Sequence, residues 1–117
     1  MDVGVAGRCA VITGGARGIG FATARILAAE GANIALVDID EDGIAAGARK
    51  LADEFGAAAL AAAADISSPR AVAQMVEKVG AELGPPDILV NSAAVLDNKT
   101  FVESEHEDWE RMLGVCL

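Results

Sequence analysis

The sequence predicts an α/β fold in which parallel strands alternate with helices. Short apolar runs bounded by glycine or polar residues, typical of strands buried on both faces, alternate with stretches whose apolar residues recur at helical spacing. Hydrophobic residues make up 53% of the 117 residues but aromatic residues only 3%, which favours closely packed layers of helix on sheet. Because parallel strands are joined by right-handed crossovers, we expect helices on both sides of one sheet.

The first two strands and helices are the clearest elements. We expect strands at residues 9–12 and 34–37, where the runs Cys-Ala-Val-Ile and Ile-Ala-Leu-Val stand. Each run is followed by an apolar stripe at helical spacing, first Ile19, Ala22, Ile26 and Ala29, then Ile44, Ala48, Leu51 and Phe55. Gly31 and Gly56 are the expected C-terminal ends of these two helices.

The next elements continue the alternation. Residues 57–64 are alanine apart from Leu60 and have high helix propensity. We still predict a strand, because the segment lies between two helices and a strand buried on both faces needs small apolar residues. Ser68 and Pro69 predict a helix start, Gly84 ends that helix, and residues 88–90 form a fourth strand.

The last predicted element is a helix that the end of the sequence cuts short. Ser104 and Glu107 have capping-box spacing, and Trp109 and Cys116 lie on one apolar face that follows. We therefore expect residues 1–117 to be one domain that is incomplete at its C-terminus.

The charge balance argues against several partners. Eighteen acidic against nine basic residues give a net charge of −9, and the basic residues are scattered, so neither nucleic acid nor an anionic membrane surface is expected. No apolar run approaches the roughly 20 residues of a membrane span, and no signal-peptide pattern opens the chain. We expect a cytoplasmic protein. Cys9 and Cys116 lack metal-ligand spacing, so no metal site is expected.

A glycine-rich turn from Thr13 to Gly20 separates the first strand from the first helix. Helix N-terminal amides and the helix dipole can bind a pyrophosphate at such a place, although a tight connection alone also uses glycine. No Lys-Ser or Lys-Thr pair follows the glycines, which excludes a P-loop.

Asp38 ends the second strand 18 residues after Gly20, close to the spacing at which a carboxylate binds the adenosine ribose hydroxyls. The alternative is a solvated turn acid. Arg17 favours NADP, since a cation in the phosphate turn could accept its extra phosphate. We expect NAD to be preferred, because Asp38 lies where that phosphate would be.

Asp65 and Asn91 end the third and fourth strands, and ligands of open α/β sheets bind at the carboxyl ends of strands. Taken singly, each could equally serve a local turn. Polar residues at four consecutive strand ends favour a binding site.

These residues resemble the classical short-chain dehydrogenase/reductase family, whose TGxxxGxG turn is matched by Thr13, Gly14, Gly18 and Gly20. The resemblance implies a Rossmann-type doubly wound parallel sheet, here truncated after about four strands and the start of the next helix. Residues 1–117 would then be one dinucleotide-binding domain that is incomplete at its C-terminus. Asp38 resembles the NAD-selecting acid, Asp65-Ile66 the pair that flanks adenine, and residues 91–94 the NNAG segment. The cofactor-binding residues it implies are Gly14, Arg17, Gly18, Ile19, Gly20, Asp38, Ile39, Asp65, Ile66, Asn91 and Ala93.

The same resemblance predicts that this chain is inactive. The catalytic Ser and Tyr-x-x-x-Lys are absent, and the sequence contains no tyrosine. Ala94 replaces the last glycine of NNAG, and Cys116 stands where a catalytic Asn is expected, which a thiol cannot replace. We expect a truncated NAD-dependent oxidoreductase acting on an alcohol or ketone in its parent form, or alternatively a non-catalytic NAD-binding or regulatory module that needs a partner.

The same residues leave one alternative fold open and also predict self-association. A flavodoxin-like or receiver-like domain would also carry acids at strand ends, but it does not require the glycine turn.

Stopping after the fourth strand would leave a bare sheet edge, so we expect self-association through residues 88–91 and the helix that carries Trp109.

Overall fold

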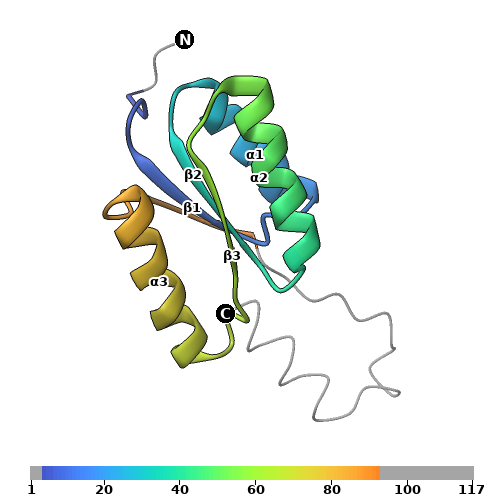
Figure 1. Ribbon diagram of the computed structural model, residues 1–117, viewed down its shortest axis with the longest axis vertical. Coiled ribbons are helices and arrows are strands. Elements are labelled where there is room, and N and C mark those ends of the chain that lie inside the picture. The colour runs from blue at the N-terminus through green and yellow to red at the C-terminus, as the bar shows by residue number, and fades with distance from the viewer. Residues whose placement is uncertain (1–3, 93–117) are drawn as a thin grey trace.

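The computed structural model describes residues 4–92 of the chain. Within this range the predicted alternation of strands and helices is confirmed (Figure 1). In chain order the elements are β1 (Cys9–Thr13), α1 (Gly18–Ala29), β2 (Asn33–Asp38), α2 (Glu41–Phe55), β3 (Ala59–Ala63), α3 (Pro69–Leu83) and β4 (Ile88–Asn91). The predictions made for Ala93, Ala94 and the helix that carries Trp109 and Cys116 lie outside the described residues.

All the strands of this sheet are parallel, in the order β3-β2-β1-β4. Val11 of β1 lies opposite Ala35 of β2 on one side and Leu89 of β4 on the other. The chain therefore moves outward from β1 to β3 and then returns past β1 to β4. The carboxyl ends of β1 and β4 form the point where the strand order reverses, which is where open α/β sheets bind ligands.

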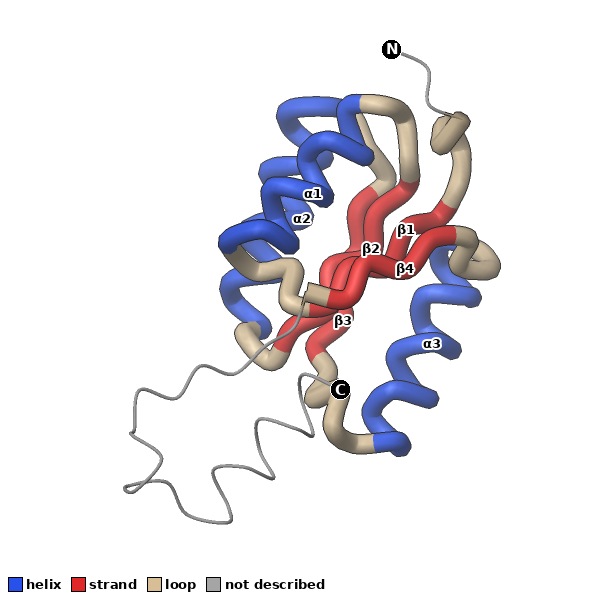
Figure 2. The backbone as a smooth tube through the Cα atoms, turned by 180° about the vertical axis from the view of Figure 1, so that it is seen from behind, coloured by secondary structure: helices blue, strands red, loops and turns tan. Residues whose placement is uncertain are grey.

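Helices cover both faces of the sheet, α1 and α2 on one side and α3 on the other (Figure 2). Alternate residues of β1 point into two separate cores, with Ala10 and Ile12 toward α1 and α2, and Cys9 and Val11 toward α3. The strands β1 and β2 are thus buried on both faces, as their continuous apolar runs predict. The predicted doubly wound, Rossmann-type fold is confirmed.

The helix α1 is confirmed, but the apolar stripe that predicted it is not its buried face. The apolar stripe that begins with Ile19 and Ile26 faces outward, with 80% and 66% of these two residues exposed. The buried residues of α1 are instead Gly20, Ala24 and Ala28. Small residues at every fourth position let the helix backbone lie close against β1 and β2, and a larger side chain on this face would hold the helix away.

The strand predicted at residues 57–64 is confirmed, but its expected burial on both faces is wrong. The strand β3 runs from Ala59 to Ala63 and lies at the edge of the sheet, where of these five residues only Ala62 is fully buried. An edge strand leaves one row of backbone groups without a neighbouring strand. Its small side chains therefore fit beside α2 and α3 without being enclosed by them.

Candidate functional site

The glycine-rich turn leads directly from β1 into α1, and its positions require glycine for two different reasons, backbone conformation and space. Gly14 and Gly18 have φ angles of +66° and +63°, a region that disfavours other residues. Gly20 is required by space, because a Cβ there would press on the Gly14 carbonyl oxygen and stand 2.5 Å from Ser92 Oγ. The turn can therefore keep this shape only with glycine at these positions.

The N-terminus of α1 differs from those of α2 and α3 in lacking a side-chain cap. Asp40 caps α2 by accepting a hydrogen bond from Gly43, and Ser68 caps α3 by accepting one from Ala71. At α1 the capping position is Arg17, whose side chain makes no cap hydrogen bond, and the first turn contains no acidic residue. First-turn N–H groups of a helix need an acceptor, and an anionic ligand can supply one.

Asp38, half-buried at the end of β2, connects the glycine-rich turn to the turn before α2. Its Oδ2 accepts a hydrogen bond from the backbone N–H of Ala16 at 3.2 Å, and its Oδ1 accepts one from the N–H of Asp40 at 3.1 Å. An ionised carboxylate has about four lone-pair sites, so both oxygens keep capacity for further donors. The carboxylate is thus held in place and still able to accept hydrogen bonds from ligand hydroxyls.

A second link between the same two turns is ionic. The guanidinium of Arg17 lies 3.6 Å from Asp40 Oδ2, and the two side chains are 84% and 38% exposed. Exposed apolar side chains stand beside these charges, since Ile19 is 80% exposed and Ile39 is 74% exposed. The carboxyl edge of the sheet therefore offers polar groups and bare apolar surface together, as ligand sites do.

Asp65 forms a local turn after β3. Its Oδ1 accepts hydrogen bonds from the Ser67 hydroxyl at 2.6 Å and from the Ser67 backbone N–H at 3.0 Å. These two bonds, the hydroxyl bond first, lower the pKa of the Asp65 carboxyl below its ordinary value. Ile66 is partly buried against the core under α3. The structure shows this turn role for Asp65, and contact of Asp65 and Ile66 with adenine stays a prediction.

Asn91 and Ser92 fasten the end of β4 to the end of β1. The hydroxyl of Thr13 donates to Asn91 Oδ1 at 2.8 Å, and the hydroxyl of Ser92 donates to the Thr13 carbonyl oxygen at 2.7 Å. Ser92 also lies next to Gly20, so its hydroxyl packs against the glycine-rich turn. The two strand ends and the turn therefore form one connected unit.

The structure brings the glycine-rich turn, Arg17 and Asp38 together at the carboxyl ends of the strands. It adds Asp40, which was not a predicted site residue, and it gives contacts to Ser92, which was predicted only as part of the NNAG-like segment. Ser92 contacts Thr13, which is distant in the sequence, and Asp40 contacts Arg17 across the gap between two turns. A signal for Asp40 was present, because an acid three residues before Gly43 has N-cap spacing. Ser92 carries no comparable local signal. The predicted site residue Ala93 lies outside the described residues.

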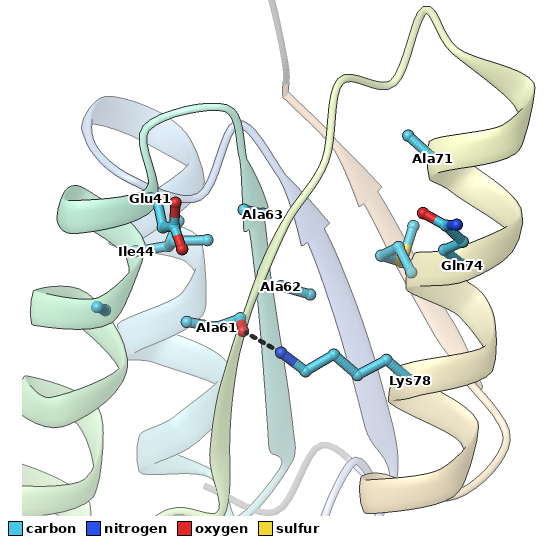
Figure 3. Close-up of a pocket in the computed structure, with 10 residues that line it drawn as sticks. Glu41, Ile44, Ala61, Ala62, Ala63, Ala71, Gln74 and Lys78 are labelled. Atoms are coloured by element: carbon cyan, nitrogen blue, oxygen red, sulfur yellow. Dashed lines mark hydrogen bonds between the residues drawn. The ribbon is translucent and has the colours of Figure 1, made fainter.

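A cavity of about 360 Å³ lies elsewhere, between α2 and α3 on the outer side of β3 (Figure 3). It is lined by Glu41, Ile44, Ala45, Ala61, Ala62, Ala63, Ala71, Gln74, Met75 and Lys78. None of the predicted cofactor-binding residues lines it. Lys78 Nζ donates to the Ala61 carbonyl oxygen at 3.2 Å, so a cation occupies part of the open strand edge, which discourages pairing with another strand.

Other chemical groups in residues 4–92 offer no second site. Cys9 is buried, and burial, followed by the nearby charge of Asp87, raises the pKa of its thiol, which keeps the sulfur unreactive. The described part of the chain holds no group of three or more His, Cys, Asp or Glu side chains that could bind a metal. No helix in that part is both long enough and apolar enough to cross a membrane.

Comparison with known proteins agrees with this geometry. The family described as short chain dehydrogenase matches residues 8–117, and the chain therefore belongs to that family. A short chain dehydrogenase/reductase of Macrophomina phaseolina is 35% identical over 97% of this chain and 65% of its own length. A 3-oxoacyl-[acyl-carrier-protein] reductase of Chlamydia muridarum is 33% identical over 94% of this chain and 44% of its own length.

A solved structure of a relative has the same fold. L-sorbose reductase from Gluconobacter frateurii, complexed with NADPH and L-sorbose, is 41% identical, with a TM-score of 0.91 over 98% of this chain and 44% of that one. The chain thus spans less than two thirds of the length of each of these three relatives.

Proposed function

We propose that the chain binds a nicotinamide adenine dinucleotide at the carboxyl edge of its sheet and prefers NAD to NADP. The observation that carries this proposal is the pairing of an uncapped α1 N-terminus with a fixed carboxylate at Asp38. The first-turn N–H groups would bind the pyrophosphate, and Asp38 would accept hydrogen bonds from the adenosine ribose hydroxyls. Bound there, the dinucleotide would supply hydride chemistry.

The preference for NAD rests on charge. A 2′-phosphate would lie where the ribose hydroxyl meets Asp38, so two negative groups would share one place. The L-sorbose reductase and a blue fluorescent protein from a metagenomic library are complexes with NADPH, and Arg17 would favour the same choice here. We give Asp38 the larger weight because two backbone N–H groups hold it, whereas Arg17 is exposed.

The parent activity that we propose is NAD(P)-dependent oxidoreduction of an alcohol or ketone. In this chain of 117 residues the proposal is binding without turnover, because the sequence holds no tyrosine to donate or accept the substrate proton. The alternative is a non-catalytic NAD-binding or regulatory module that works with a partner. The uncapped α1 N-terminus, the fixed Asp38 carboxylate and the lack of tyrosine would suit that function as well. For either function we propose a cytoplasmic location and no nucleic-acid partner.

Calorimetric titration of the purified chain with NAD and with NADP tests this proposal. We expect saturable NAD binding, weaker NADP binding, and no change in reduced-nicotinamide absorbance when ketones are added to the chain with NADH. Absence of NAD binding to a chain that circular dichroism shows to be folded would overturn the binding proposal. Turnover would overturn the proposed inactivity.

We also propose that two copies of the chain associate through β4. Within residues 4–92 this strand pairs only with β1, and Leu89 on it is 69% exposed. An apolar residue on a free strand edge favours pairing with a second copy. The helix that carries Trp109 was expected to contribute but lies outside the described residues.

Leu89→Lys is expected to reduce that association, because a charge on the free edge opposes strand pairing. Light scattering at tens of micromolar should give a mean mass above the monomer for the unmodified chain and a lower mean mass for the variant. Val76→Lys is the matched control, since Val76 is also an exposed apolar residue, 47% accessible, but lies on α3. A monodisperse monomer for the unmodified chain would contradict the proposal.

A further inference from the structure

Asp40 is held from three directions at the turn between β2 and α2. Its backbone N–H donates to Asp38 Oδ1, its Oδ1 accepts from the N–H of Gly43 at 3.0 Å, and its Oδ2 lies 3.6 Å from the Arg17 guanidinium. A Cβ at Gly43 would collide with the Asp40 carboxylate, so the glycine makes room for this arrangement. Asp40 is therefore a positioned acid and not a freely moving surface residue.

The position of Arg17 makes its partner important. Arg17 occupies the N-cap position of α1, immediately before Gly18, and its side chain is 84% exposed. A guanidinium at such a place is well suited to bind a phosphate through paired N–H donors. The Asp40 carboxylate, 3.6 Å from the guanidinium, lowers the positive potential that a phosphate would meet there.

We propose that Asp40 is a specificity-determining residue that keeps Arg17 from binding the 2′-phosphate of NADP. Asp38 repels that phosphate directly, whereas Asp40 acts through Arg17, so the two acids exclude NADP by separate means. The inference rests on the proposed dinucleotide site and extends it to a residue that is not itself expected to touch NAD.

Asp40→Asn is the variant that tests this proposal. Asparagine caps a helix about as well as aspartate, so α2 keeps its start while Arg17 loses its ionic partner. We expect the ratio of the Kd for NADP to the Kd for NAD to fall about fivefold to tenfold, the gain from one freed charge-assisted contact. The gain should shrink as salt is raised, which a purely structural role of Asp40 would not produce.

Two further variants separate the explanations. In Asp40→Asn combined with Arg17→Ala the ratio should equal that of Arg17→Ala alone, because the gain acts through the guanidinium. Glu54→Gln is the matched control: it breaks an ion pair between α1 and α2, Arg25 with Glu54 at 2.6 Å, and should leave the ratio unchanged. Asp40→Ser, which also caps a helix, repeats the measurement if Asp40→Asn does not fold.

The outcomes distinguish this inference from the proposal on which it rests. If the unmodified chain binds NAD but Asp40→Asn leaves the ratio within about twofold, Asp40 does not set specificity and only this inference is overturned. A fall of the same size in Glu54→Gln would overturn it too, because the effect would then be one of net charge. If neither dinucleotide binds the unmodified chain, both proposals are overturned.

Discussion

Gly20→Ala is expected to weaken dinucleotide binding strongly and to lower the free energy of unfolding by about 2 kcal/mol. The added methyl group would press on the Gly14 carbonyl oxygen and stand 2.5 Å from Ser92 Oγ, so the glycine-rich turn must shift. After such a shift the first-turn N–H groups of α1 would no longer converge on the pyrophosphate. Loss of two charged contacts predicts an NAD affinity lower by about 100-fold, measurable by calorimetry.

Gly80→Ala is the control for this change. Gly80 also lies in a helix, α3, but a Cβ there would meet no atom within 4 Å. Alanine at an exposed helix position should raise stability by about 0.5–1 kcal/mol through helix propensity, with NAD affinity unchanged. If Gly20→Ala unfolds at the same denaturant concentration as the unmodified chain and binds NAD equally well, the close approach of the turn to Ser92 has no functional importance.

The strands could be predicted from the sequence where the residues are large, and less well where they are small. Ile34 and Leu36 belong to a short apolar run typical of a strand buried on both faces, and both are fully buried. In α1, by contrast, periodicity pointed to Ile19 and Ile26, yet small residues face the sheet. A glycine or alanine carries almost no hydrophobic signal, so its burial depends on how closely two elements approach.

The position of β3 at the edge of the sheet also could not be predicted from its own residues. The alternation of helices and strands indicated a strand there despite the helix propensity of its alanines, but the order of strands decides whether that strand is central or at an edge. That order depends on crossovers between distant segments, which no short stretch of sequence specifies. The alanines of residues 59–63 are compatible with either position.

The site could be predicted in part for a related reason. Asp38 follows from its spacing to the glycine-rich turn, because one βαβ unit fixes that distance in both sequence and space. The contact of Ser92 could not be predicted from its place in the NNAG-like segment, since its partner Thr13 lies 79 positions away and meets it only when β4 packs beside β1. Contacts within one unit leave a sequence pattern, and contacts between units do not.

Asp38→Ala is expected to lower NAD affinity by roughly 10-fold to 30-fold, about the loss of one or two hydrogen bonds to a charged group. NADP affinity should fall less or rise, because the carboxylate that would repel the 2′-phosphate is gone. The ratio of the two Kd values, measured by calorimetric titration, should therefore approach or pass unity. Some stability will also be lost, because the N–H groups of Ala16 and Asp40 lose their acceptor.

Asp87→Ala separates the loss of stability from the loss of recognition. Asp87 Oδ2 accepts a hydrogen bond from the backbone N–H of Cys9 at 3.0 Å, at the amino ends of β1 and β4, the opposite end of the sheet from Asp38. Removing it should lower the free energy of unfolding by about 1–2 kcal/mol, as Asp38→Ala should, but leave the Kd for NAD unchanged. Equal losses of NAD affinity in the two variants would mean that Asp38 supports the fold and does not read the ribose.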